Sequence, residues 1–153
     1  MAYSKAVASA ITAYFNEQGL TYELDEDKGF MESAFTLDNK LEGYKQRILL
    51  LEKEYLVWSV VGFVEERYRR EVAKFIARVN YTYTVGYLTI NMESGQVTHC
   101  YHEYFKNRIL SEAVIGHGLI IGGKCLMDYG NALYAVMNGE LSAKAAFDTV
   151  KKG

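Results

Sequence analysis

The order of hydrophobic and polar residues in the first third of the chain predicts one helix followed by strands. Ser4 has the side chain of a helix N-cap, and apolar residues then recur at helical spacing until Gly19, a residue typical of helix ends. Apolar and polar residues alternate from Leu20 to Leu24 and again from Met31 to Leu37, which indicates strands with one buried face. The Asp-Lys-Gly sequence at 27–29 predicts the turn between them.

Two further segments predict neighbouring strands, YKQRILLLE at 44–52 and YLVWSVVGF at 55–63, with Lys53 and Glu54 between them. The second segment is apolar at both odd and even positions around Trp58. Such a pattern is typical of a strand in the middle of a sheet whose two faces are both covered. We therefore expect residues 55–63 to lie centrally, covered on each side.

The stretch EERYRREVAKFIARVNYTYTVGY, at 65–87, raises the question of a nucleic-acid surface because it holds five basic side chains. One apolar stripe of a helix over 65–80 is formed by Tyr68, Val72, Phe75, Ile76 and Val79. Another side carries Arg67, Arg70, Lys74 and Arg78, with Glu66 and Glu71 three or four residues from basic partners. The interleaved glutamates would repel phosphates, and no helix-turn-helix partner precedes this helix. We interpret it as a packing helix with a solvated, salt-bridged face.

The second half of the chain predicts a hairpin and two more helices. Leu88, Ile90 and Met92 alternate with polar residues up to a turn, MESGQ, in which Gly95 favours a positive φ; residues 96–104 return as the partner strand. Ser111 and Ser142 are expected to cap a long helix, which Gly139 ends, and a short final helix. The predicted fold class is thus α+β, an antiparallel sheet with packed helices in the order α-β-β-β-β-α-β-β-α-α.

Length and composition limit the classes of protein that this chain can represent. Its 153 residues suit a single domain over 1–153 with a sizeable core. The formal charge of −2 gives no general attraction for nucleic acid, and neither a signal peptide nor a run of about 18 apolar residues is found. The two cysteines fit a reducing compartment better than a disulfide framework. We expect a cytoplasmic protein with no membrane and no nucleic-acid partner.

The sequence GHGLIIGGKC, at 116–125, contains the spacing of a phosphate-binding loop. Gly118, Gly123 and Lys124 match that spacing, but Cys125 stands where a Ser or Thr would bind magnesium. The segment also lies inside an amphipathic helical pattern instead of between a strand and a helix. Gly118 and Gly122, one turn apart, would allow another backbone to approach closely. We expect a packing role and no nucleotide cofactor.

The sequence HCYH, at 99–102, suggests a metal or nucleophile site. On a strand His99 and His102 point to opposite faces, so that only Cys100 and His102 could share a ligand. Zinc needs three or four protein ligands, and the remaining candidates, His117 and Cys125, lie on the later helix. A Cys–His pair on a pleated face does not by itself give an activated thiolate. We therefore predict no metal and no catalytic residue.

Tyrosine is unusually frequent, with 13 residues, and it is enriched at protein interfaces. Several of these residues lie close together after the second helix and on the following hairpin. The residues expected to form a partner or homodimer surface are Tyr81, Tyr83, Val85, Tyr87, Tyr101 and Tyr104. The alternative is that these side chains cover the sheet within one subunit.

Several short motifs make the chain similar to the YbjN family of bacterial proteins. They are REV at 70–72, Phe75-Ile76, RVNY at 78–81, Gly86, YLTIN at 87–91, SGQV at 94–97, MDY at 127–129, AVMNG at 135–139 and SAKAA at 142–146. The first 60 residues resemble the family in order and pattern rather than in motif. The chain departs from the family in having no proline, and Gly130 is expected to take the place of a proline in the long helix.

This resemblance implies a fold similar to type III secretion chaperones, and a family described as regulators of sensory transduction without known catalytic residues. We expect a non-catalytic interaction or regulatory protein, chaperone-like, that holds a protein partner or acts in sensory or stress regulation. The alternative is a small-ligand-binding protein or an enzyme that uses the Cys100/His102 face. A deep pocket at these two residues would favour the alternative, and a shallow apolar strip rimmed by charges would favour the first hypothesis. Within the shared motifs we expect Asn80 to end its helix in a left-handed conformation, and Gly86 to permit a sharp entry into the next strand.

Overall fold

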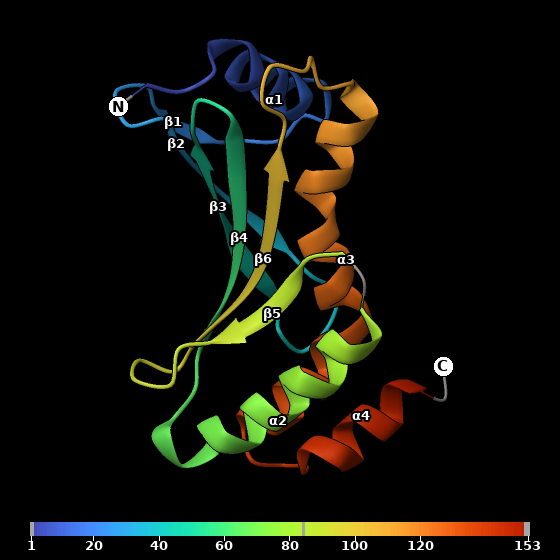
Figure 1. The fold of residues 1–153 in the computed structure, drawn as a ribbon. Helices are drawn as coiled ribbons and strands as arrows, with labels where there is room; N and C mark the ends of the chain where they lie inside the picture. Colours follow the sequence, from blue (N-terminus) through green and yellow to red (C-terminus); the bar gives the residue numbers. More distant parts are fainter. Residues whose placement is uncertain (1, 84, 152–153) are drawn as a thin grey trace.

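The computed structural model describes residues 2–83 and 85–151, which form one six-stranded antiparallel sheet and four helices, the last of them packed on the two helices before it (Figure 1). The outer limits of the predicted domain, residues 1 and 153, lie outside the described residues. The elements are α1 Lys5–Glu17, β1 Glu23–Asp25, β2 Phe30–Thr36, β3 Gly43–Leu50, β4 Glu54–Phe63, α2 Glu66–Thr82, β5 Tyr87–Ile90, β6 Gln96–Tyr104, α3 Glu112–Met137 and α4 Ala143–Lys151. Both the predicted fold class and the predicted order of elements are confirmed.

The sheet has the strand order β1-β2-β3-β4-β6-β5, so β4 lies near its centre, between β3 and β6, as the sequence predicts. Helices α1 and α3 cover one face, called the inner face below (Figure 1). The expectation that β4 is covered on each side is wrong. In the described part of the chain no helix packs on the outer face, where Leu56, Trp58 and Val60 remain partly exposed.

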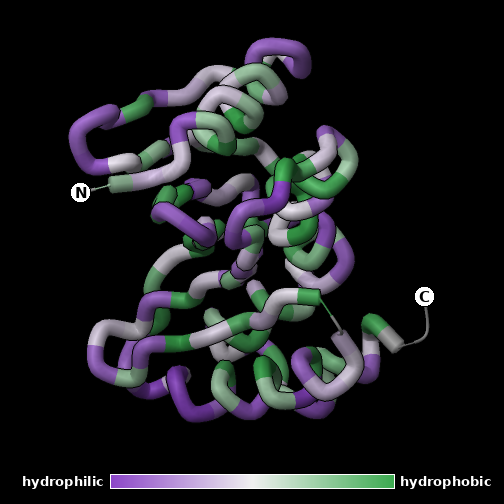
Figure 2. The backbone as a smooth tube through the Cα atoms, turned by 45° about the horizontal axis from the view of Figure 1, so that its top comes forward, coloured by the Kyte–Doolittle hydropathy of each residue, from purple (hydrophilic) through white to green (hydrophobic). Residues whose placement is uncertain are grey.

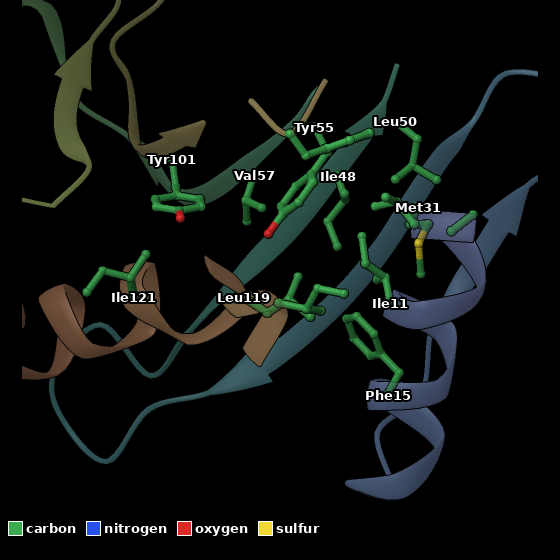
Figure 3. Close-up of a cluster of buried hydrophobic side chains, with 14 residues drawn as sticks. Ile11, Phe15, Met31, Ile48, Leu50, Tyr55, Val57, Tyr101, Leu119 and Ile121 are labelled. Carbon is green, nitrogen blue, oxygen red and sulfur yellow. The ribbon is translucent and has the colours of Figure 1, made fainter. Parts of the chain in front are cut away.

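One part of the core lies between α1, the first half of α3 and the inner face of the sheet. Ile11 and Phe15 of α1 point toward the strands and α3, and Leu119 of α3 faces them across the layer (Figure 3). The start of α1 is fixed as predicted, because the Ser4 hydroxyl accepts a hydrogen bond from the Val7 N–H at 3.2 Å. This packing places α3 lengthwise over the sheet.

Helix α3 approaches the sheet closely at two glycines. A Cβ atom on Gly118 would lie 2.7 Å from both Tyr55 Oη and Tyr101 Cε1, and one on Gly122 would collide with Ser59. The predicted packing role of this glycine pair is therefore confirmed, but the atoms that approach the two glycines belong to side chains of the sheet and not to another backbone. The segment that matches phosphate-loop spacing lies wholly inside α3, where the backbone N–H groups are used by the helix.

The other part of the core joins α2, α4 and the second half of α3 to β5 and β6. The predicted apolar stripe of α2 is buried at Val72, Phe75, Ile76 and Val79. In Figure 2 the turns of the helices at the lower edge alternate between hydrophilic and hydrophobic residues. The helix therefore buries one side, and its charged residues lie on the other.

Asn80 does not end α2 as the sequence analysis expects, because the helix continues to Thr82. Its side chain instead bonds to the backbone of Leu88 on the edge strand β5: Nδ2 donates to the Leu88 carbonyl, and Oδ1 accepts from the Leu88 N–H, both at 2.9 Å. The expected positive φ angle of Gly95 is confirmed, at 80°, and Gly86, expected to permit a sharp entry into β5, has a φ of 69°. The Asn80 amide thus makes the two backbone hydrogen bonds at Leu88 that a neighbouring strand would otherwise make.

One basic residue of α2 has a structural role that the charge pattern does not reveal. The Arg69 guanidinium donates hydrogen bonds to the carbonyls of Val64 at 2.9 Å, Met92 at 3.1 Å, Glu93 at 2.7 Å and Ser94 at 3.2 Å. These bonds hold the β5–β6 turn against the start of α2. A cation used in this way is not available to a nucleic acid.

Candidate partner-binding site

A cleft of about 940 Å³ lies between α2 and α4, with Tyr129 of α3 also in its lining. On α2 the lining positions fall at 71, 74, 77, 78, 81 and 82, which is one side of the helix over three turns. The complete lining consists of Glu71, Lys74, Ala77, Arg78, Tyr81, Thr82, Tyr129, Ser142, Ala143, Lys144, Phe147 and Val150. We call this the α2–α4 cleft.

The apolar part of the α2–α4 cleft comes mainly from α4 and Tyr129, whereas most lining residues of α2 are charged or polar. Ala77 on α2 and Ala143 on α4 leave space, and Phe147, Val150 and the Tyr129 ring line that space while remaining partly exposed. Apolar side chains that remain partly exposed in a cleft still contact water, and they lose that contact when another molecule covers them. The cleft is therefore suited to an apolar group.

The first turn of α4 is attached to α2 through Glu71. Its Oε2 atom accepts a hydrogen bond from the Ala143 N–H at 2.7 Å, and its Oε1 atom lies 3.1 Å from Lys74 Nζ. The hydrogen bond from the Ala143 backbone lowers the pKa of Glu71 most, followed by the one from Lys74. Ser142 adds the expected cap, since its hydroxyl accepts from the Ala145 N–H at 3.1 Å.

Basic side chains outnumber acidic ones around the cleft. Lys74 and Arg78 lie on the α2 wall and Lys144 on the α4 wall, whereas Glu71 is the acidic lining residue. Lys144 also pairs with Asp148 on the exposed side of α4, at 2.8 Å. Because the whole chain has a formal charge of −2, this excess of positive charge is a local property of the cleft.

The tyrosine-rich residues predicted to form one surface lie in three different places. Tyr81 is 92% exposed at the cleft, Tyr87 and Tyr104 are exposed on the outer face of the sheet, Tyr101 is buried, and Tyr83 and Val85 are half-buried against the core. Tyr101 points toward α3 (Figure 3), and Tyr83 packs edge-on against the His99 and Tyr129 rings. The structure therefore does not bring the six residues together, and Tyr101 is unavailable to a partner.

The outer face of the sheet forms a second exposed apolar surface, which we call the outer strip. Cross-strand neighbours place Leu49 beside Leu56, and Cys100 between Trp58 and Tyr87. The outer strip consists of Leu49, Leu56, Trp58, Val60, Tyr87 and Cys100. An ion pair and a hydrogen-bonded pair border it, with Arg47 Nε 3.1 Å from Glu32 Oε1 and His102 Nε2 2.6 Å from Glu54 Oε2.

Cys100 and His102 do share this outer face, as strand alternation predicts, but they do not form a pocket together. Burial raises the pKa of the Cys100 thiol, opposite to what a nucleophilic thiolate needs. The hollow beside Cys100 measures about 240 Å³, includes Trp58 in its lining and does not include His102, which is turned to Glu54. A shallow strip rimmed by charges therefore fits this face better than a ligand pocket does.

His99 lies on the inner face, opposite to His102 as predicted, and is 1% exposed. Burial lowers its pKa to about 4, with a smaller opposing effect from the Val85 carbonyl, and Nε2 has no well-formed hydrogen bond within the described residues. The side chain is therefore a neutral part of the core at physiological pH. Within residues 2–83 and 85–151, no three His, Cys, Asp or Glu side chains converge as a metal site would require.

Helices in the described ranges are all too short or too polar to cross a membrane. Comparisons of the sequence with protein-family models and with curated proteins gave no match. Among solved structures, the chain is similar to YbjN from E. coli, described as a candidate transcription regulator, with a TM-score of 0.58. The alignment covers 86% of this chain and 90% of that chain, at 8% sequence identity. The fold is YbjN-like.

This YbjN-like fold confirms the resemblance noted from the short motifs at the level of architecture. Sequence reasoning placed α4 correctly but missed the α2–α4 cleft, because the separation of two helices depends on tertiary contacts such as the one from Glu71 to Ala143. A signal was nevertheless present: Ala143, Ala146, Phe147 and Val150 give α4 an apolar side, and Phe147 and Val150 extend it beyond the fully buried positions.

Proposed function

We propose that the chain is a non-catalytic regulatory protein that acts by holding a segment of a partner protein in the α2–α4 cleft. The observation that carries this proposal is the cleft itself, about 940 Å³ in volume and lined by apolar side chains with charged residues among them. The YbjN-like fold supports it, since the similar E. coli protein is described as a candidate regulator. The role is chaperone-like, in sensory or stress regulation.

The energy available in this cleft suits a segment with a few apolar anchors. Burying one large hydrophobic side chain contributes about 1.5–3 kcal/mol, so three anchors contribute about 5–9 kcal/mol before the entropy of association is subtracted. Binding on this scale is reversible, as regulation requires. It also depends on complete burial of the anchors, which Phe147, Val150 and Tyr129 would provide.

A second copy of the chain is the occupant that we propose for the outer strip. Trp58, Tyr87 and the aliphatic residues beside them form a patch that could be buried against its own copy around a two-fold axis. Two of the residues predicted from the tyrosine pattern, Tyr87 and Tyr104, lie on this face. A standard interface buries about 800 Å² on each partner. The outer strip shares no residue with the lining of the α2–α4 cleft, so the two proposed surfaces are separate.

Photocrosslinking inside the native cell tests whether the cleft holds a protein. A photoreactive phenylalanine analogue would replace Tyr81 or Phe147 in the cleft and, as a control, Ile109, which is 99% exposed outside it. We expect one protein to crosslink from both cleft positions and not from Ile109. Capture of the same proteins from all three positions, or of none, would contradict the proposed function.

A further inference from the structure

We propose that the occupant of the α2–α4 cleft is an amphipathic helix with acidic residues along both flanks. This inference rests on the proposed function and adds the chemistry of the partner. The shape of the cleft, the hydrogen-bonding state of its walls and the distribution of its charges each support it.

The length of the cleft matches a short helix. Lining positions on α2 extend from Glu71 to Thr82, and eleven residues of helix span about 16 Å. On the opposite wall the lining runs from Ser142 to Val150, through most of α4. An incoming helix of about three turns would thus have a helical wall on each side and the Tyr129 ring beneath it.

Backbone hydrogen bonding favours a helix over an extended segment. Both walls are helices, whose interior backbone N–H and C=O groups are bonded within their own helix, and the N–H of Ala143 is bonded to Glu71. Since none of the described lining residues belongs to a strand, they offer no strand edge to pair with an extended peptide. A strand buried there would leave unpaired polar groups along its backbone. A helix satisfies these groups internally, and presents side chains to the walls.

The distribution of charge specifies acidic flanks. Lys74 and Arg78 stand on one wall and Lys144 on the other, so a helix between them meets positive charge on both sides. The single acidic lining residue, Glu71, is directed to the Ala143 N–H and Lys74. Arg78 can therefore face the occupant, and Lys144 can do so by exchanging its exposed ion pair with Asp148 for one with the occupant. The partner sequence is therefore expected to have apolar residues at i, i+3 or i+4, and i+7, with Asp or Glu beside them.

Synthetic peptides provide the direct test on the purified full chain. Three peptides of about 14 residues would share one apolar face: the first with glutamates on the flanks, the second with lysines there, and the third a copy of the first with a central proline. Fluorescence anisotropy is expected to show at least tenfold tighter binding of the glutamate peptide than of the other two. Raising the salt concentration should reduce the difference in affinity between the glutamate and lysine peptides, because this difference is electrostatic.

Charge-reversed variants assign the preference to the cleft. The double variant Arg78→Glu and Lys144→Glu is expected to reverse the preference, so that the lysine peptide binds more tightly. Arg70→Glu provides the matched control, because Arg70 is exposed on α2 and is absent from the cleft lining. The control should keep the original preference, and circular dichroism should show that both variants remain folded.

Other results would overturn the inference in distinguishable ways. Equal binding of the glutamate and lysine peptides, or a preference unchanged in the double variant, would exclude acidic flanks while leaving a helix-binding cleft in place. Saturable binding of sodium decanoate without binding of any peptide would assign the cleft to an anionic amphiphile. Crosslinking of a partner from Tyr81 and Phe147 without peptide binding would retain the proposed function and exclude the helix. Absence of the crosslinks would contradict both the proposed function and the helical occupant.

Discussion

The carboxylate of Glu71 on α2 accepts a hydrogen bond from the Ala143 backbone at the start of α4, at 2.7 Å. This bond joins the two walls of the α2–α4 cleft at one end. It also satisfies a backbone N–H group in the first turn of α4, where helices lack internal partners. The start of α4 is therefore attached to one side chain of another helix, in addition to the apolar packing of Ala143 and Ala146.

Removing this carboxylate should loosen α4. In Glu71→Ala we expect faster amide hydrogen exchange across Ala143–Lys151 than in the unsubstituted chain, because the bond from Ala143 is lost. Lys74→Gln is the matched control, since it removes the ion pair with Glu71 and keeps the bond from Ala143. Equal protection of α4 in all three proteins would show that apolar packing alone holds the helix.

The same bond predicts that the stability of α4 depends on pH. Because the pKa of Glu71 is lowered in the folded chain, the bond stabilises the fold fully above the ordinary value of 4.5 and is lost as the pH falls through the lowered value. Amide exchange in α4, corrected for intrinsic rates, should therefore accelerate in acid more in the unsubstituted chain than in Glu71→Gln. An identical acid response in the two proteins would argue against this assignment.

Phe75 should contribute far more to stability than its basic neighbour on α2. Its side chain is fully buried, so Phe75→Ala is expected to lower the free energy of unfolding by about 3–5 kcal/mol. Arg70→Ala removes an exposed charge and should change it by about 0–1 kcal/mol. Urea denaturation of both variants measures the difference, and the reverse order would contradict the packing role of α2.

Burial of neutral His99 should make the fold less stable in acid. Its pKa is about 4 in the folded chain and 6.5 ordinarily, so the unfolded chain binds more protons as the pH falls through this interval. Between pH 7 and pH 4 the unsubstituted chain should lose about 3 kcal/mol more stability than His99→Leu. Parallel curves of unfolding free energy against pH would show that His99 is protonated without penalty.

Self-association should depend on the outer strip and not on Tyr83. Sedimentation at micromolar concentration is expected to show a homodimer, and Tyr87→Glu should shift it toward monomer by placing a carboxylate in a desolvated contact. Tyr83→Glu is a poor test, because that ring packs on His99 and Tyr129 and its loss would disturb the fold. The mass of a single chain throughout a dilution series would rule out the dimer.

The features predicted correctly from the sequence depend on local physical chemistry. Ser4 and Ser111 begin their helices, and Gly139 adopts a positive φ at the end of α3, because caps and left-handed turns select residue types over a few positions. The apolar stripe of α2 was equally visible, since helical periodicity alone determines which residues share a side.

The errors concern contacts between distant residues. The apolar second face of β4 indicated a covered strand, yet the chain supplies no helix for it within the described residues. Tyr101 looked like a surface residue because strand alternation does not specify which face α3 covers. The α2–α4 cleft was missed for the same reason: it depends on how far apart two helices are held, and the apolar side of α4 does not encode that distance.

The bonds between Asn80 and Leu88 restrict one route by which copies of a β-sheet protein join, the pairing of edge strands. An edge strand with free backbone groups invites further strands, and repeated addition produces open-ended polymers. Here an amide side chain occupies the donor and acceptor of Leu88, so growth of the sheet across β5 is blocked at that residue. The association that we propose through the outer strip would instead use side chains, and a two-fold contact of that kind is complete after two copies. Asn80→Ala would free the backbone groups of Leu88 and so allow polymerisation through β5, an effect that a measurement of stability would not reveal.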